Sequence, residues 1–262
     1  MVNTGTDATT PVRGSSYWEC SQQPLQALLF LLPLIVFYEV GLRLFGTDPS
    51  IGDSHDIRAR QLLFEFFDWF GINAYYLPSL IVVSVLLSWH VIRREAWRIH
   101  PGLYGWMWFE SLVIAAPLYV FVLVLFRGPV DHPAGLQASG PLAGEGVGLA
   151  GGFELGWQAK LIFSVGAGIY EELLFRLIGL AVLHMLLVDV LALPDRVGAI
   201  IAIAVSSLLF AWYHFTSVAQ IEPGLFLYYT AAGVYLACLY LVRGFGIVVG
   251  THAMFDILVV LL

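Results

Sequence analysis

The chain has 262 residues, of which 59% are hydrophobic, 15% aromatic and 12% charged, with a formal net charge of −7 and a mean hydropathy of +0.83. Soluble globular proteins carry about 25% charged residues, so this composition excludes a soluble enzyme. Intrinsic disorder is also excluded, because it requires low hydrophobicity. The acidic residues are spread along the chain, so the net charge does not indicate a nucleic-acid partner. The remaining class is a protein that crosses a lipid bilayer several times.

Seven apolar stretches have about the length that a helix needs to cross the ~30 Å hydrocarbon core of a bilayer. They cover residues 24–45, 74–92, 103–126, 157–188, 197–214, 225–242 and 245–262. The sequence therefore predicts an all-α, polytopic membrane helix bundle of seven or eight transmembrane helices. We expect one integral membrane domain over residues 24–262, preceded by a polar N-terminal tail over residues 1–23.

Three segments outside these stretches have signatures of their own. Residues 57–76 combine charged side chains with a Leu and Phe face, which predicts an amphipathic helix lying on the membrane surface. Residues 128–156 are rich in Gly, Ala and Pro and lack the Lys-Ser/Thr pair of a phosphate loop, which indicates an extramembrane loop. Three arginines lie at residues 93–98, two spans after the N-terminus, and favour a cytoplasmic N-terminus by the positive-inside rule.

Charged residues inside the apolar stretches are candidates for a functional site, because a charge at mid-bilayer costs at least ~2.5–3.5 kcal/mol. Eight of the 12 basic and 19 acidic residues lie there: Glu39, Arg43, Glu110, Lys160, Glu171, Glu172, Arg176 and Asp256. Glu39 and Arg43 are four residues apart and are expected to form a structural pair. Glu110 lies beside aromatic residues and is expected to be a packed acid.

The fourth stretch concentrates three charges in the run Tyr-Glu-Glu-Leu-Leu-Phe-Arg at residues 170–176. Glu172 and Arg176 are four residues apart and can pair along one helix face. Glu171 projects about 100° away from that face, so it lacks this partner. A buried carboxylate without a partner in a dry site suits a general base that works near neutral pH.

Two histidines lie in later stretches. His214 ends the fifth stretch, where a lone histidine is most often a hydrogen-bonding residue at the interface. His252 is followed four residues later by Asp256, so a carboxylate is within reach of the imidazole and can fix its tautomer or share an ion with it. The later stretches thus add two imidazoles and a third carboxylate to the candidate site.

Three patterns stand in order on the fourth, fifth and seventh stretches: Glu171-Glu172-x-x-x-Arg176, Phe210-x-x-x-His214 and His252-x-x-x-Asp256. With these patterns the chain resembles the CPBP family of intramembrane proteases, also called the Abi or CAAX prenyl protease 2 family, whose motifs are EExxxR, FxxxH and HxxxN/D. The resemblance covers residues 157–262. The chain departs from the family by Asp256 in place of the commoner Asn, and by seven stretches where the family often has eight.

The resemblance implies an intramembrane endopeptidase that cleaves near the C-terminus of a membrane-anchored or lipidated, CAAX-like substrate. It also implies that Glu171 is the general base for a water and that His214 shares or orients this water. His252 and Asp256 would stabilise the tetrahedral oxyanion, and the Glu-Arg pair of the first motif would hold the site together. An ionised Asp256 cannot donate a hydrogen bond, which favours it as the residue that orients His252 or as a metal ligand.

The role of a metal stays open at this point. His214, His252 and Glu171 or Glu172 form a His₂-carboxylate set of the kind that holds a catalytic zinc ion and leaves a position for water. Members of the family have been described both as metalloproteases and as metal-free, glutamate-dependent proteases. The sequence slightly favours the metal-free mechanism, because the ligands come from three helices and the adjacent glutamates have their own base role. A divalent metal such as zinc is the alternative cofactor.

Two other functions could use the same residues. An ion- or proton-coupled transporter would employ Glu171, Glu172, His214 and Asp256 as a relay, and a non-catalytic membrane scaffold would keep the motifs for stability. For a joint site the motifs must meet, although His214 lies at the end of its stretch and Glu171 lies ~21 Å from the start of its own. We therefore expect the fifth helix to continue past His214 toward Gln220, and the fourth to begin outside the bilayer.

Overall fold

The computed structural model describes residues 16–45, 57–72, 74–125, 157–215 and 221–261. Within these ranges every regular element is a helix, which confirms the all-α prediction. Five of these helices are long and apolar enough to cross a membrane, so the chain is an integral, multi-pass membrane protein. The extramembrane loop expected over residues 128–156 lies outside the described residues.

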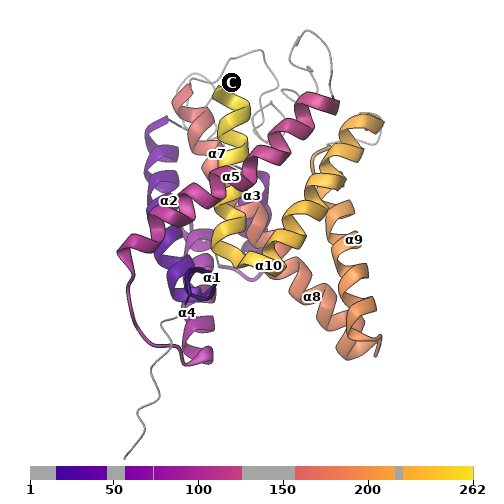
Figure 1. Cartoon of the computed structure of the whole chain (residues 1–262), viewed down its shortest axis with the longest axis horizontal. Helices are drawn as coiled ribbons and strands as arrows, with labels where there is room; N and C mark the ends of the chain where they lie inside the picture. Colours follow the sequence, from indigo (N-terminus) through magenta and orange to yellow (C-terminus); the bar gives the residue numbers. More distant parts are fainter. Residues whose placement is uncertain (1–15, 46–56, 73, 126–156, 216–220, 262) are drawn as a thin grey trace, which may run out of the picture.

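The helices follow one another in the order shown in Figure 1. They are α1 (Tyr17–Ser21), α2 (Pro24–Phe45), α3 (Arg58–Asp68), α4 (Leu77–Arg93), α5 (Pro101–Leu125), α7 (Trp157–Glu172), η1 (Leu173–Leu180), α8 (Ala181–His184), η2 (Met185–Val190), α9 (Asp195–Tyr213) and α10 (Pro223–Leu261). The last part of the expected polar tail thus includes the short helix α1. The expected surface helix is α3, which is shorter than the 57–76 segment.

Helix α10 is a pair of helices joined at a break. Its 39 residues would measure ~58 Å as one straight helix, about twice the hydrocarbon thickness. At Gly244 the backbone has φ 79° and ψ 179°, a conformation that is essentially restricted to glycine. In Figure 1 the first arm, residues 223–243, runs down from the right, and the second arm, residues 245–261, rises through the centre to the C-terminus.

These arms correspond to the last two apolar stretches of the sequence. The count of seven or eight spans is nevertheless not confirmed, since five helices meet the length and hydropathy required of a span when α10 is counted once. Helix α4 is apolar but has only 17 residues.

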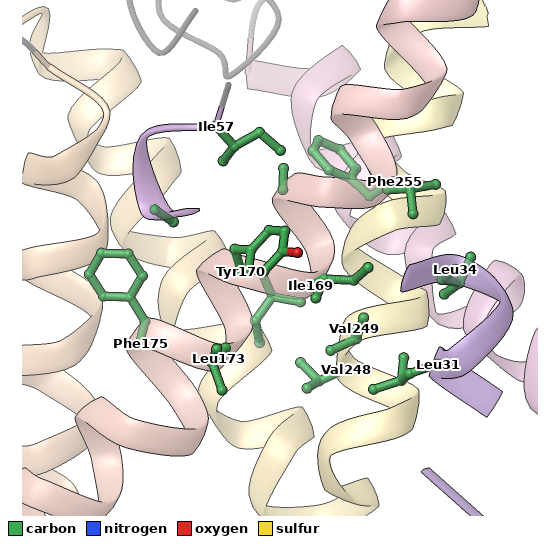
Figure 2. Packing of buried hydrophobic residues seen from close by; sticks show 14 of the residues in the cluster. Leu31, Leu34, Ile57, Ile169, Tyr170, Leu173, Phe175, Val248, Val249 and Phe255 are labelled. Atoms are coloured by element: carbon green, nitrogen blue, oxygen red, sulfur yellow. The ribbon is translucent and has the colours of Figure 1, made fainter. Parts of the chain in front are cut away.

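The second arm of α10 forms the centre of the bundle and packs against α7, α5 and α2. A Cβ atom added at Gly250 would clash with Ser111 of α5 and contact Phe30 of α2. These helices therefore approach the second arm closely. On the α7 side, Ile169 points toward Val249 in Figure 2. Helix α9 packs on the first arm, where Gly233 comes close to Ser207. The second arm therefore packs against α7 and the first arm against α9, so that α10 contacts both helices.

The fourth stretch is a continuous helical run of 34 residues, Trp157–Val190. It changes from α-helical to π-helical hydrogen bonding directly after Glu172. Short π-helical segments inside α-helices are frequent at functional sites, and no feature of the sequence had indicated this one. The change of helix type lies between Glu172 and Arg176, within the first motif.

The expectation that the fifth helix continues past His214 is wrong. Helix α9 ends at Tyr213, His214 is its C-terminal cap, and the amide of Phe215 already bonds back to the carbonyl of Trp212. The motifs still meet, because Glu171 lies near the middle of the 34-residue run and the end of α9 reaches that depth. The expected start of the fourth helix outside the bilayer stays a prediction.

Candidate active site

The residues of the three motifs come together where α7, η1, α9 and the second arm of α10 meet. Glu171 and Glu172 end α7, Arg176 lies in η1, and His214 caps α9. All six candidate side chains are buried, with exposed fractions of 0% for Glu171 and Glu172, 1% for Arg176, 4% for His252, 6% for Asp256 and 4% for the His214 side chain. The structure therefore unites every residue that the sequence singled out for the site.

Glu171 lies at the centre of this group. Both of its carboxylate oxygens are buried, and neither has a hydrogen-bond partner in the described part of the chain. Its Oε2 atom lies 3.8 Å from Nε2 of His214 and 3.8 Å from Nε2 of His252. These separations are longer than hydrogen bonds, so Oε2 lies close to both imidazoles without bonding to either.

His252 is oriented by Glu172. Its Nδ1 atom lies 2.7 Å from Oε1 of Glu172, and the same Oε1 lies 3.0 Å from Nη1 of Arg176, which confirms the expected Glu172–Arg176 pair. Asp256 is on the other side of the ring, with Oδ2 3.6 Å from Nε2 of His252. The orienting contact that the sequence favoured for Asp256 is thus made by Glu172, while Asp256 lies on the side of the ring that faces Glu171.

His214 is held by its own helix and by one aromatic ring. Its Nδ1 lies 2.7 Å from the carbonyl oxygen of Phe210, so Nδ1 carries the proton and donates. The ring stacks on that of Tyr229, with centroids 4.0 Å apart and an interplanar angle of 19°. With Nδ1 protonated, the neutral ring presents the Nε2 lone pair to Glu171.

The contacts of the Phe210 ring account for the aromatic residue in the second motif. The guanidinium carbon of Arg176 lies 4.2 Å from the Phe210 ring centroid, a favourable cation–π distance. The same ring lies 4.6 Å from the His214 ring and 6.0 Å from the His252 ring. Phe210 therefore packs between the cation of the first motif and the imidazoles of the other two.

The alternative of a bound metal stays a prediction. In the described ranges, no group of three His, Cys, Asp or Glu side chains is arranged to hold a metal ion. Glu171, His214 and His252 would be the ligands in that alternative, and a bound zinc ion would supply a Lewis acid for the water.

Sequence reasoning missed two residues that contribute to this region. Tyr229 stacks on His214 but belongs to no motif, and no spacing signal marks it. Arg243, which the sequence assigns to a loop, is 2% exposed and pairs with Glu110. The gap between the stretches 225–242 and 245–262 indicated the break in α10, but not that Arg243 is buried there.

The comparison with known families agrees with this geometry. Residues 154–258 match the family model described as Type II CAAX prenyl endopeptidase Rce1-like. This segment contains all three motifs, and the match confirms the resemblance stated from them. The fold and the match together define a membrane-embedded endopeptidase domain, and residues 154–258 belong to the CAAX prenyl endopeptidase family. No curated protein and no solved structure matches the chain.

Proposed function

We propose that the chain is an intramembrane endopeptidase that hydrolyses a peptide bond near the C-terminus of a membrane-anchored or lipidated, CAAX-like protein. The observation that carries this proposal is the buried Glu171 carboxylate, which has no hydrogen-bond partner in the described residues and faces the Nε2 atoms of His214 and His252 at 3.8 Å. The family of the matched segment supports the substrate class.

In the first step a water molecule is activated between Glu171 and His214. Glu171 accepts one proton of the water, and the Nε2 lone pair of His214 accepts a hydrogen bond from the other O–H. This arrangement leaves a lone pair of the water oxygen free to attack the carbonyl carbon of the substrate. A positioned base of this kind contributes about 10²–10⁴-fold to the rate.

In the second step the oxyanion of the tetrahedral intermediate is stabilised by His252. Glu172 accepts from Nδ1 of His252 at 2.7 Å, and in the imidazolium form His252 also donates from Nε2 to the oxyanion. When the intermediate collapses, the C–N bond breaks and the leaving nitrogen takes the proton held by Glu171. Arg176 balances the charge of Glu172 and keeps that carboxylate in place.

The test is peptide release by the purified Glu171→Gln variant in detergent or liposomes, with a peptide whose cysteine near the C-terminus carries an isoprenyl group. We expect kcat to fall by about 10²–10⁴-fold. The matched control is Glu65→Gln, the same change at an exposed position of α3, which is expected to keep wild-type kinetics. Normal cleavage by Glu171→Gln would overturn the proposed mechanism.

Two further experiments distinguish the endopeptidase from the transporter and the metal-free mechanism from the zinc mechanism. Ion flux into liposomes that is lost in Glu171→Gln, without cleavage of any peptide by the wild type, would favour the transporter. Metal analysis with a chelator challenge addresses the cofactor, and stoichiometric zinc that is required for cleavage would replace the metal-free mechanism.

The cytoplasmic N-terminus that the arginines of residues 93–98 favour is testable by the accessibility of an N-terminal tag in sealed vesicles.

A further inference from the structure

Tyr229, in the first arm of α10, has a hydroxyl group whose position the proposed mechanism leaves unexplained. The residue is 5% exposed, and its hydroxyl has no hydrogen-bond partner among the described residues. A buried polar group without a partner costs about 1–3 kcal/mol. An aromatic ring needed only for packing on His214 would avoid this cost as phenylalanine.

The face of α10 that carries Tyr229 is directed at the site. One helical turn further along, the carbonyl of Gly233 accepts a hydrogen bond from Nη2 of Arg176 at 3.4 Å. Residues four apart share a helix face, so Tyr229 and Gly233 both face the motif residues. The Tyr229 ring also stacks on that of His214, whose Nε2 lies 3.8 Å from Oε2 of Glu171.

The chemistry of amide hydrolysis calls for a donor at this place. An oxyanion is commonly held by more than one hydrogen-bond donor, and His252 supplies one. Where the motif usually has Asn, this chain has Asp256, whose carboxyl group donates only when it is protonated. A phenolic hydroxyl remains protonated at neutral pH and donates at every pH at which the base works.

We propose that Tyr229 is a further catalytic residue, whose hydroxyl donates a second hydrogen bond to the oxyanion beside His252. This inference rests on the proposed endopeptidase function. The O–H bond of Tyr229 stays intact throughout: the hydrogen bond forms when water adds to the carbonyl and is released when the C–N bond breaks. The proton of the water still passes through Glu171 to the leaving nitrogen.

The variant Tyr229→Phe tests the hydroxyl alone, because the ring that stacks on His214 is kept. We expect kcat to fall on the order of 10²-fold, as for loss of an oxyanion donor, with little change in KM. The unfolding temperature is expected to stay the same or to rise. The matched control is Tyr235→Phe, because the Tyr235 hydroxyl on the same arm donates to the carbonyl of Ile114 at 2.7 Å. Its loss is expected to lower the unfolding temperature and leave kcat unchanged.

Two further measurements exclude a merely structural role. A peptide aldehyde, whose hydrate resembles the tetrahedral intermediate, is expected to lose affinity for Tyr229→Phe by at least about tenfold, while the uncleaved peptide binds as before. In an Asp256→Asn background an amide donor is present at all pH values, so Tyr229→Phe is expected to cost a smaller factor there. Equal factors in both backgrounds would contradict a shared oxyanion.

Wild-type kcat in Tyr229→Phe would overturn this inference. If Glu171→Gln is inactive in the same assay, that result leaves the endopeptidase function standing and removes only the role of Tyr229. If Glu171→Gln is fully active, the proposed function itself fails, and the role of Tyr229 with it.

Discussion

The guanidinium of Arg243 donates two hydrogen bonds to the carboxylate of Glu110, at 2.5 and 2.6 Å, one residue before the break of α10 at Gly244. The same guanidinium donates to the Ser21 hydroxyl at 2.9 Å and lies 3.8 Å from the Trp18 ring centroid. Helices α1 and α5 are therefore fastened to α10 at the point where its direction reverses.

Tyr17 adds a third contact to this ion pair. Burial, together with the hydrogen bond to Glu110, raises the pKa of Tyr17 above its usual value. The hydroxyl therefore stays protonated and donates to the Glu110 carboxylate at 2.5 Å. Because the second arm of α10 begins two residues after Arg243, these contacts set the direction of the helix that carries His252.

Replacement of Arg243 by Met is expected to destabilise the protein by about 1.5–3 kcal/mol, because it leaves the half-buried Glu110 carboxylate without its cation and two hydrogen bonds. The measurement is thermal or denaturant unfolding in detergent. The double variant Glu110→Gln with Arg243→Met removes both charges and is expected to recover much of the loss. Equal stability of the single and double variants would show that the pair is not energetically coupled.

A second prediction concerns Gly168, where α7 packs closely against the second arm of α10. A Cβ atom at this position would lie 2.9 Å from the backbone nitrogen of Ala253 and 2.9 Å from the carbonyl oxygen of Val249. Gly168→Ala is therefore expected to push the helices apart near Glu171 and His252. Misplacement by ~1 Å can cost about 10²-fold in rate, so we expect kcat to fall at least tenfold.

The control for this change is Gly105→Ala in α5, where nothing lies within 4 Å of the added atom. It is expected to leave kcat unchanged and to stabilise its helix slightly, since Ala is the better helix former. Unchanged kcat in Gly168→Ala would mean that the bundle relaxes around the added methyl group without separating the motifs.

Helix α3, which the sequence predicts to lie on the membrane surface, is connected to the site through Arg60. Its Nη2 atom donates to the carbonyl of Tyr75 at 2.7 Å and lies 3.6 Å from Oε1 of Glu39. The same oxygen accepts from the Tyr170 hydroxyl at 3.2 Å, and Tyr170 directly precedes Glu171. Figure 2 shows Tyr170 on the side of α7 that faces Ile57, the residue that leads into α3.

Arg60→Gln is expected to lower the stability by about 3–5 kcal/mol, because Glu39 then lacks its buried cation. Arg58→Gln on the same helix is the matched comparison, since Arg58 is half-buried and donates to the Tyr213 carbonyl at 2.9 Å. Its loss is expected to cost ~1 kcal/mol, as for one hydrogen bond. If the two variants lose equal amounts of stability in unfolding experiments, the apolar contacts of α3, and not the Arg60–Glu39 pair, hold this helix in place.

The helices could be predicted closely from the sequence, because bilayer thickness dictates the length of an apolar run. Helix α2 begins and ends where the first apolar stretch does, and α9 starts two residues before the fifth stretch and ends one residue before its end. The three motifs also predicted which side chains meet, since an unpaired charge in an apolar helix needs a partner from another helix. These features follow from local composition and spacing.

The partners of the other buried charges could not be predicted in this way. Spacing predicts a pair of Glu39 with Arg43, but Glu39 pairs with Arg60, and Arg43 lies 4.8 Å from the Tyr76 ring centroid. Spacing within a helix is visible in a sequence, whereas a contact between helices depends on how they pack. For the same reason the sequence did not predict Arg243 as the partner of Glu110, since the two residues are 133 positions apart.

The last prediction concerns Asp256, where the third motif commonly has Asn. Its Oδ2 atom lies 3.6 Å from Nε2 of His252, on the side that faces Glu171. A carboxyl group at this place donates to the oxyanion only while it is protonated. Peptide release by the wild type is therefore expected to decline as the pH rises through the range in which Asp256 ionises.

Asp256→Asn carries an amide that donates at every pH, so its rate is expected to decline at a higher pH than that of the wild type. The measurement is kcat against pH for the wild type, Asp256→Asn and Asp256→Ala. The alanine variant lacks any donor at this position and is expected to be slower than Asp256→Asn at every pH. If Asp256→Asn is as slow as Asp256→Ala, the negative charge itself is required, which would return Asp256 to the role of holding His252 in its charged form or binding a cation.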